Sequence, residues 1–167
     1  MREETAARVD DPVEEAARQW ALRYPDPEGF RALVSLVRGY SATVREVEAV
    51  LRPLGLNISR FEVLLLLSFR RSGALPMMRI RDLLLVHGSS VTYLVNRLEE
   101  AGLVERAADP DDGRVSLVRL TDAGRERIDR AARELAAAEF GSFAALDDGE
   151  LGRLSGLLGA LRRETPA

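Results

Sequence analysis

The stretch from Leu83 to Thr121 changes its hydrophobic period, and few folds accommodate such a change. Its apolar residues first recur at i, i+3, i+4 and i+7, the spacing of one buried stripe on an α-helix: Val91, Leu94, Val95 and Leu98. Gly102 then supplies the left-handed residue that commonly ends a helix. Two extended segments follow, Leu103–Arg106 and Val115–Leu120, on either side of the turn-rich run 109–113. The pattern predicts a helix followed by a hairpin with a charged tip.

The helix that Ser89 and Ser90 open is polar on the face opposite its apolar stripe. This face carries hydroxyl, amide and guanidinium groups: Ser90, Thr92, Tyr93, Asn96 and Arg97. Such a helix suits the major groove of DNA, and the hairpin tip can reach the next groove. Upstream, we expect a first helix at Arg79–Val86, a turn at Gly88, and a short edge strand at Leu75–Met77, where proline is tolerated. The expected fold class is mainly α with a small β-hairpin, a winged helix-turn-helix.

Four linked pieces of this region form one spaced pattern: Val91-Thr92-x-Leu94-Val95-x-Arg97-Leu98-Glu99, Gly102-Leu103-Val104-Glu105-Arg106, Asp109-Pro110-x-Asp112-x-Arg114 and Leu120-Thr121-x-x-Gly124. Together they resemble the MarR family of bacterial transcriptional regulators. The resemblance in motif covers roughly residues 80–130 and implies a winged helix-turn-helix that binds DNA. Tyr93 stands where the family usually has an Arg, and Asn96 where it usually has an Asp. Both are expected to face the groove, so they bear on which bases are read.

The residues expected to contact DNA lie on the second helix, before it and at the hairpin tip: Ser89, Ser90, Thr92, Tyr93, Asn96, Arg97, Arg79, Arg81, Asp112 and Arg114. For the helix, the alternative is a solvated face that makes no contact with bases or phosphates. For Arg114, the alternative is an ion pair with Asp112, which contributes little stability if it is exposed. The resemblance implies that Arg114 contacts the minor groove or its phosphates, and the two roles can coexist.

The formal net charge of -3 at pH 7 argues against a protein that coats nucleic acid by bulk charge. We therefore expect a DNA-binding surface made by geometry, in which the acids lie elsewhere and four arginines gather on one side: Arg79, Arg81, Arg97 and Arg114. The chain has no cysteine, which excludes disulfides, thiolate metal sites and a cysteine redox sensor. We expect no cofactor.

An enzyme is disfavoured because the chain has a single histidine, His87, and neither a phosphate-cradling glycine motif nor metal-ligand spacing. Since no second His or Cys can complete a site, His87 is expected to be a solvated turn residue rather than a metal ligand. The acidic N-terminus does not resemble a signal peptide, and the longest apolar run, Val63–Leu67, is too short to cross a bilayer. We therefore expect a cytoplasmic protein.

Helical patterns flank the predicted DNA-binding lobe, about residues 56–121, and we expect the 167 residues to form one domain. Helices over about 12–52 precede the lobe, and helices over about 122–164 follow it. In the last helix, leucines recur at a spacing that suits a helix-helix seam: Leu151, Leu154, Leu158 and Leu161. The seam could pack within the chain, but we favour a two-fold homodimer through these flanking helices, which would read palindromic operators.

Three helix starts carry capping residues. Ser59-Arg60-Phe61-Glu62 has the form of a capping box, and the helix that it starts is apolar all round, so this helix should lie at the centre of the protomer. Thr121 is expected to cap the helix that follows the hairpin. Asp147-x-x-Glu150 is a further start of the capping-box type.

Trp20, Glu62 and Arg106 resemble residues of the urate-responsive branch of the MarR family, where they line a ligand pocket. That branch has a further Arg where this chain has Leu94, so the resemblance favours another small organic anion over urate. Each residue also has a structural alternative. Trp20 would be a packing anchor, Glu62 would only complete its capping box, and Arg106 would pair with Glu105 or Glu100.

Together these patterns favour a sequence-specific transcriptional regulator, a repressor that a small organic anion releases from DNA. The alternative is a winged-helix module that contacts only proteins and has no effector pocket. A bland second helix would favour that alternative, whereas a face with Ser, Thr, Tyr, Asn and Arg favours DNA.

Overall fold

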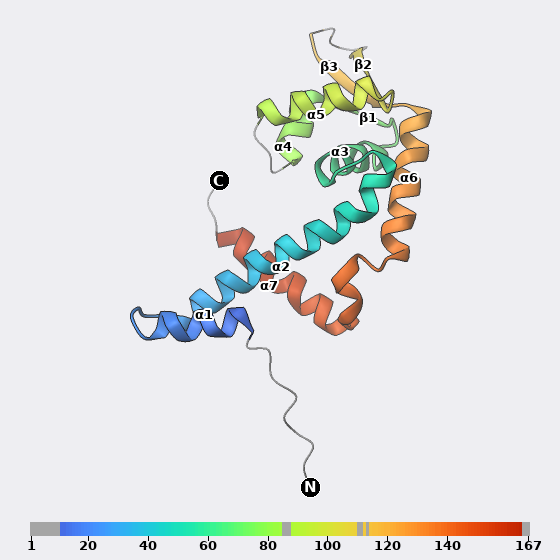
Figure 1. Ribbon diagram of the computed structural model, residues 1–167. Coiled ribbons are helices and arrows are strands. Elements are labelled where there is room, and N and C mark those ends of the chain that lie inside the picture. Colours follow the sequence, from blue (N-terminus) through green and yellow to red (C-terminus); the bar gives the residue numbers. More distant parts are fainter. Residues whose placement is uncertain (1–10, 85–87, 110–111, 113, 165–167) are drawn as a thin grey trace. The chain divides into compact units, whose positions relative to one another are not determined.

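The computed structural model describes residues 11–84, 88–109, 112 and 114–164 (Figure 1). Along these residues the elements are, in order, α1 (Pro12–Ala21), α2 (Pro27–Leu51), the 3-10 turn η1 (Arg52–Leu54), α3 (Ile58–Ser68), β1 (Ala74–Pro76), α4 (Met77–Leu83), α5 (Gly88–Glu100), β2 (Val104–Ala108), β3 (Ser116–Leu120), α6 (Asp122–Ala137), the 3-10 turn η2 (Gly141–Ala145) and α7 (Asp148–Glu164). The chain forms two compact units, residues 1–44 and 45–167, so α2 begins in the first unit and ends in the second. The predicted fold class, mainly α with a small hairpin, is confirmed.

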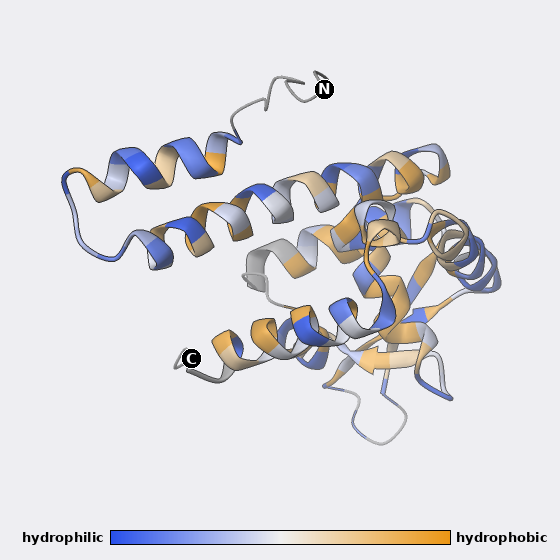
Figure 2. Ribbon diagram, turned by 90° about the horizontal axis from the view of Figure 1, so that it is seen from below, coloured by the Kyte–Doolittle hydropathy of each residue, from blue (hydrophilic) through white to orange (hydrophobic). Residues whose placement is uncertain are grey.

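Hydrophobic and hydrophilic residues alternate along the helices, as expected of helices that bury one face (Figure 2). The predicted stripe of α5 is buried, with no more than 7% of any of its residues exposed: Val91, Leu94, Val95 and Leu98. The central place predicted for α3 is also confirmed. Val63, Leu64 and Leu67 are completely buried, and α3 packs against α5, α6 and β3. The core of the second unit therefore surrounds α3.

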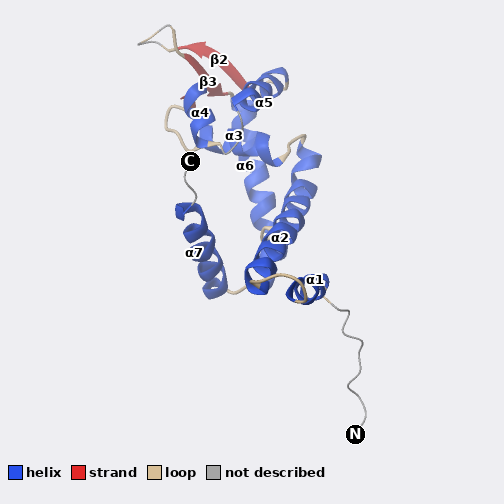
Figure 3. Ribbon diagram, turned by 90° about the vertical axis from the view of Figure 1, so that its left-hand side faces the viewer, coloured by secondary structure: helices blue, strands red, loops and turns tan. Residues whose placement is uncertain are grey.

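The three strands form an antiparallel sheet in the order β1-β3-β2. Figure 3 shows β2 and β3 side by side in red. Strands β2 and β3 are the predicted hairpin, in which Arg106 lies opposite Val118. Strand β1 pairs with the other edge of β3 and ends at Pro76, a residue that edge strands tolerate because it removes no central hydrogen bond. Gly102, with a φ of 68°, separates α5 from the hairpin, as predicted.

The two helices of the helix-turn-helix are α4 and α5. Helix α4 begins at Met77 and ends at Leu83, two to three residues earlier at each end than predicted. It stops there because Leu84 has an extended conformation, with a ψ of 131°. Gly88, predicted to make the turn, is the first residue of α5. His87 lies outside the residues that the structure describes.

The capping box predicted at Ser59 is wrong. Helix α3 begins at Ile58, and its cap is Asn57, whose side-chain oxygen accepts a hydrogen bond from the Arg60 amide at 2.9 Å. Asn57 has the extended backbone that a cap requires, whereas Ser59 is already helical. Glu62 therefore does not complete a capping box.

The other two predicted helix starts are confirmed. The Thr121 hydroxyl accepts from the Gly124 amide at 3.0 Å and donates to the Gly102 carbonyl at 2.8 Å, so it joins the start of α6 to the end of α5. Before α7, the Asp147 amide donates to Glu150 at 3.0 Å and the Glu150 amide donates to Asp147 at 2.8 Å. These reciprocal bonds make a capping box.

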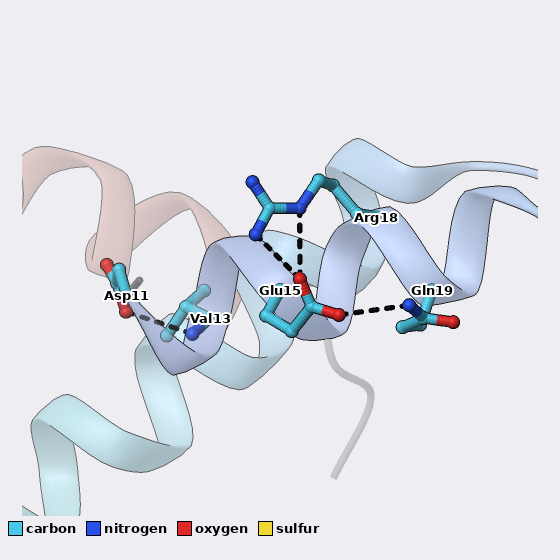
Figure 4. Close-up of polar contacts among 5 residues, drawn as sticks. All are labelled: Asp11, Val13, Glu15, Arg18 and Gln19. Carbon is cyan, nitrogen blue, oxygen red and sulfur yellow. Dashed lines mark hydrogen bonds and ion pairs between the residues drawn. The ribbon is translucent and has the colours of Figure 1, made fainter. Parts of the chain in front are cut away.

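In the first unit, α1 begins at Pro12, directly after its cap residue Asp11. Figure 4 shows the Asp11 carboxylate accepting from the Val13 amide at 2.9 Å, which satisfies a free N–H group at the helix start. Further along, Glu15 accepts from Arg18 at 2.6 Å and from Gln19 at 2.9 Å (Figure 4). Both bonds lower the pKa of the Glu15 carboxyl. Such contacts between residues three or four apart stabilise an exposed helix.

No helix among the described residues is both long enough and apolar enough to cross a bilayer. Even α2, with 25 residues, carries charged side chains along its length: Glu28, Arg31, Arg38, Arg45, Glu46 and Glu48.

Candidate nucleic-acid interface

The polar face of α5 points to solvent, because the opposite stripe is buried in the core. Its described residues are all exposed: Thr92, Tyr93, Asn96 and Arg97. The backbone of Ser89 and Ser90 is helical, but their side chains lie outside what the structure describes. The prediction of a polar, accessible helix beside a hairpin is therefore confirmed in its geometry.

Tyr93 and Arg97 form a pair one turn apart on this face. The Arg97 guanidinium lies over the Tyr93 ring, 5.3 Å from its centroid, and also pairs with Glu100 at 2.7 Å. The hydrogen bond with Tyr93, and then that with Glu100, raise the pKa of Arg97. Tyr93 itself is 58% exposed, so its ring edge is free to meet another surface.

The expectation that acids lie away from the basic groups of the interface is wrong. Arg97 pairs with Glu100, and Arg79 of α4 lies 3.8 Å from Asp82. Each pair joins residues three apart, because side chains at that spacing meet on one face of a helix. The positive charge of both arginines is thus partly balanced locally.

Asp112 organises the tip of the hairpin. Its carboxylate accepts from the backbone amide of Arg114 at 3.0 Å, and its carbonyl accepts from the Val115 amide at 2.9 Å. The contact predicted as an alternative, a pair with the Arg114 guanidinium, is replaced by this bond to the backbone. The Arg114 side chain is exposed at the tip.

Arg106 connects the root of the hairpin to α5. Its Nη1 donates to Glu99 at 2.8 Å, and its Nη2 donates to the side-chain oxygen of Asn96. The alternative partners predicted for it, Glu105 and Glu100, are wrong: Glu105 lies 3.7 Å from Arg119 and Glu100 pairs with Arg97. Sequence reasoning missed Glu99, although its place three residues after Asn96 puts both on one face of α5.

The other predicted ligand residues lie in different units. Trp20 belongs to the first unit, where its indole N–H donates to the Pro25 carbonyl at 2.7 Å and its ring stacks on Phe30 with 4.2 Å between centroids. Glu62 belongs to the second unit. Loss of hydration, caused by neighbouring protein atoms, raises the pKa of the Glu62 carboxyl.

Three of the four predicted seam leucines line an open apolar groove of the second unit. Leu151, Leu154 and Leu158 meet Phe140 and Phe143 there. The fourth, Leu161, is 55% exposed. These three leucines are thus half-buried beside the segment that precedes α7, and the groove that they line is open to solvent.

The chain is similar in sequence to known proteins over the helix-turn-helix and the hairpin. Residues 54–115, which run from the end of η1 into the hairpin, match the model of the MarR family. The HTH-type transcriptional repressor IacR of Pseudomonas putida is 30% identical over 123 residues, which cover 74% of this chain and 72% of IacR. The chain belongs to the MarR family. It is thus a DNA-binding transcriptional regulator, as the resemblance implied, and not an enzyme.

Solved structures of MarR-family regulators share the fold. The regulator Sco5413 of Streptomyces coelicolor is 40% identical, with a TM-score of 0.74 over 80% of this chain and 92% of that one. CouR of Rhodococcus jostii RHA1, solved bound to p-coumaroyl-CoA, is 29% identical, with a TM-score of 0.68 over 83% of this chain and 94% of that one. This MarR-family protein thus has the fold of solved regulators of the same family.

Proposed function

We propose that this MarR-family protein is a homodimeric repressor that binds a palindromic operator and is released by a small organic anion. The observation that carries the DNA-binding part is the exposed polar face of α5, opposite a fully buried stripe and next to a hairpin. A helix presented in this way fits the major groove. The proposed contacts are those predicted from the sequence: Ser89, Ser90, Thr92, Tyr93, Asn96, Arg97, Arg79, Arg81, Asp112 and Arg114.

Within this interface we propose a division of labour. Arg114, at the exposed tip of the hairpin, contacts the DNA backbone or minor groove and contributes affinity for any sequence. Tyr93, on the outer face of α5, contacts base edges and contributes sequence preference.

The DNA-binding proposal predicts different effects for the two sites. Arg114→Ala should weaken binding to all sequences alike and reduce the slope of log K against log salt by about one, because one phosphate contact is lost. Tyr93→Ala should change the preference among operators, at a cost of roughly 1 to 3 kcal/mol. Fluorescence anisotropy at several salt concentrations measures both quantities, and Arg133→Ala on the exposed side of α6 is the matched control. A change of preference in Arg114→Ala but not in Tyr93→Ala would contradict the proposed placement of helix and hairpin.

The homodimer is proposed from apolar surface that the single chain leaves exposed. Leu157 and Leu161 of α7 are 68% and 55% exposed, beside the groove lined by Leu151, Leu154 and Leu158. Helix α2 exposes further apolar residues: Leu33, Leu36, Val37 and Tyr40. Exposed apolar side chains that gather on a helix, as they do on α7 and on α2, favour a protein-protein interface. A two-fold dimer would present two copies of α5 to two half-sites, hence the palindromic operator.

The effector is proposed to be an organic anion held by Arg106. The Arg106 and Glu99 side chains are 33% and 37% exposed, so a carboxylate from solution can compete with Glu99 for the guanidinium. Because Arg106 also bonds Asn96 on the outer face of α5, such competition would disturb the DNA-reading face. The effector would then weaken the operator complex by a coupling free energy of roughly 1 to 3 kcal/mol, and DNA would weaken effector binding equally. Ligand binding by the related CouR supports an effector of this general kind.

This proposal predicts a specific loss in one variant. Titration calorimetry without DNA, with citrate, urate and aromatic carboxylates, should detect an anion that binds the parent and not Arg106→Ala. Arg119→Ala, on the opposite face of the same hairpin, should bind as the parent does. Because Trp20 is the only tryptophan, a change of its emission on titration tests the predicted part of Trp20 in binding. Equal binding by Arg106→Ala and the parent would remove Arg106 from the effector site.

A further inference from the structure

Three side chains join α5 to the root of the hairpin. Glu99 accepts twice from Arg106, from the backbone amide at 3.3 Å and from Nη1 at 2.8 Å. The Arg106 Nη2 in turn donates to Oδ1 of Asn96. One of these bonds ties the backbone of Arg106 to Glu99 and the other ties its guanidinium to the same carboxylate, so Nη2 is directed at the Asn96 amide.

The pleat of β2 explains why Arg106 reaches α5. Side chains alternate between the faces of a strand, so Arg106 lies on the face of Val104, which is 2% exposed and packed in the core. Its cross-strand neighbour on that face, Val118, is completely buried. Glu105 points to the other face, toward Arg119. The register of the hairpin therefore places one guanidinium beside α5.

The chemistry of this contact orients the Asn96 amide. An arginine side chain has five N–H donors and no acceptor, so the atom of Asn96 that faces it must be the carbonyl oxygen. The amide nitrogen of Asn96, with two N–H donors, lies at the other end of the planar group and is directed away from Arg106. Asn96 is exposed, so this nitrogen is the end left for a base.

We propose that Asn96 reads the major groove as a hydrogen-bond donor, and that Arg106 is the positioning residue that sets this character. The inference rests on the proposed docking of α5 in the groove. Guanine offers two adjacent acceptors there, N7 and O6, and thymine offers O4, whereas the single acceptor of adenine, N7, lies beside an amino group that is itself a donor. The usual contact of asparagine with adenine needs the oxygen and the nitrogen together, and Arg106 holds the oxygen. Asn96 therefore favours guanine or thymine over adenine or cytosine.

The same geometry predicts what an aspartate would do at this position. A carboxylate would still accept from Arg106 with one oxygen, but it would turn a second acceptor toward the groove. Asn96→Asp should therefore reverse the preference, toward the amino groups of cytosine and adenine. Because this substitution exchanges NH2 for O and keeps the shape of the side chain, a reversed preference would show that hydrogen bonding, and not shape, selects the base.

The experiment selects operators from a randomised half-site library and measures binding to the four base pairs at the position where Asn96→Ala abolishes preference. The parent should favour guanine or thymine by roughly 10-fold over adenine or cytosine, within the range of a good base contact. Asn96→Asp should reverse this order. Arg106→Met, which removes the donors but keeps an unbranched apolar stem, should release the oxygen and raise the relative affinity for adenine. Arg119→Met is the matched control and should keep the preference of the parent.

Each outcome supports or overturns the inference. An adenine preference in the parent, or an unchanged preference in Asn96→Asp, overturns it while the docking of α5 stands, provided that Thr92→Ala or Tyr93→Ala weakens binding. If no variant on the outer face of α5 affects any operator, the proposed docking fails, and the inference fails with it. Thermal melting shows whether Arg106→Met is folded, and Asn96→Asp tests the inference without that variant.

Discussion

Replacing Leu154 and Leu158 of α7 with aspartate is expected to give a monomer that binds its operator roughly 100- to 10,000-fold more weakly than the parent. The proposed dimer joins two DNA-binding modules, so the second half-site is bound at high effective concentration, and a monomer loses that gain. Two carboxylates in an apolar seam would also have to be desolvated for the dimer to form. Light scattering gives the mass, and a mobility-shift assay on a palindromic operator gives the affinity.

The controls separate loss of the dimer from loss of the fold. Arg153→Asp changes the charge of an exposed residue on the same helix and should leave the dimer intact. Leu161→Asp alters a residue that is already 55% exposed, so it should weaken the dimer without unfolding the chain. A parent protein of monomeric mass at micromolar concentration would refute the proposed homodimer.

Gly124→Ala is expected to destabilise the protein by about 3 kcal/mol, the upper part of the usual range for overpacking. A Cβ at this position would lie 2.0 Å from the Leu103 carbonyl oxygen and 2.9 Å from Cδ1 of Leu120. The carbonyl oxygen cannot move away easily, because it accepts from the Thr121 amide at 3.2 Å. For a chain of this length the melting temperature should fall by roughly 6 to 12 °C.

A glycine on another helix provides the matched control. Nothing lies within 4 Å of a Cβ built at Gly152 of α7, so Gly152→Ala should leave stability unchanged or raise it by about 0.5 to 1 kcal/mol. Differential scanning calorimetry of the two variants checks both signs. If Gly124→Ala has the same melting temperature as the parent, α6 does not pack against Leu103 as closely as described.

The order and type of the elements in the DNA-binding lobe follow from local patterns in the sequence. The stripe of α5, the glycine that ends it and the Thr121 cap of α6 are all encoded within about one helical turn of the residue concerned, so hydrophobic period and capping chemistry were sufficient. The start of α3 was placed wrongly because Asn57 and Ser59 are both good caps. The difference between them depends on backbone conformation, which residue type does not reveal.

Which side chains meet at the interface depends instead on how the folded elements pack together. From the sequence, Arg106 had acidic neighbours in Glu105 and Glu100, yet it pairs with Glu99 and Asn96. The reason is the strand: its pleat sends Glu105 to the opposite face, and the packing of β2 on α5 brings the helix face of Asn96 and Glu99 to Arg106. Spacing along the chain cannot predict a partner that depends on how two elements pack. Local patterns could therefore identify α5 as the proposed DNA-binding helix, but they could not predict the orientation of the Asn96 amide.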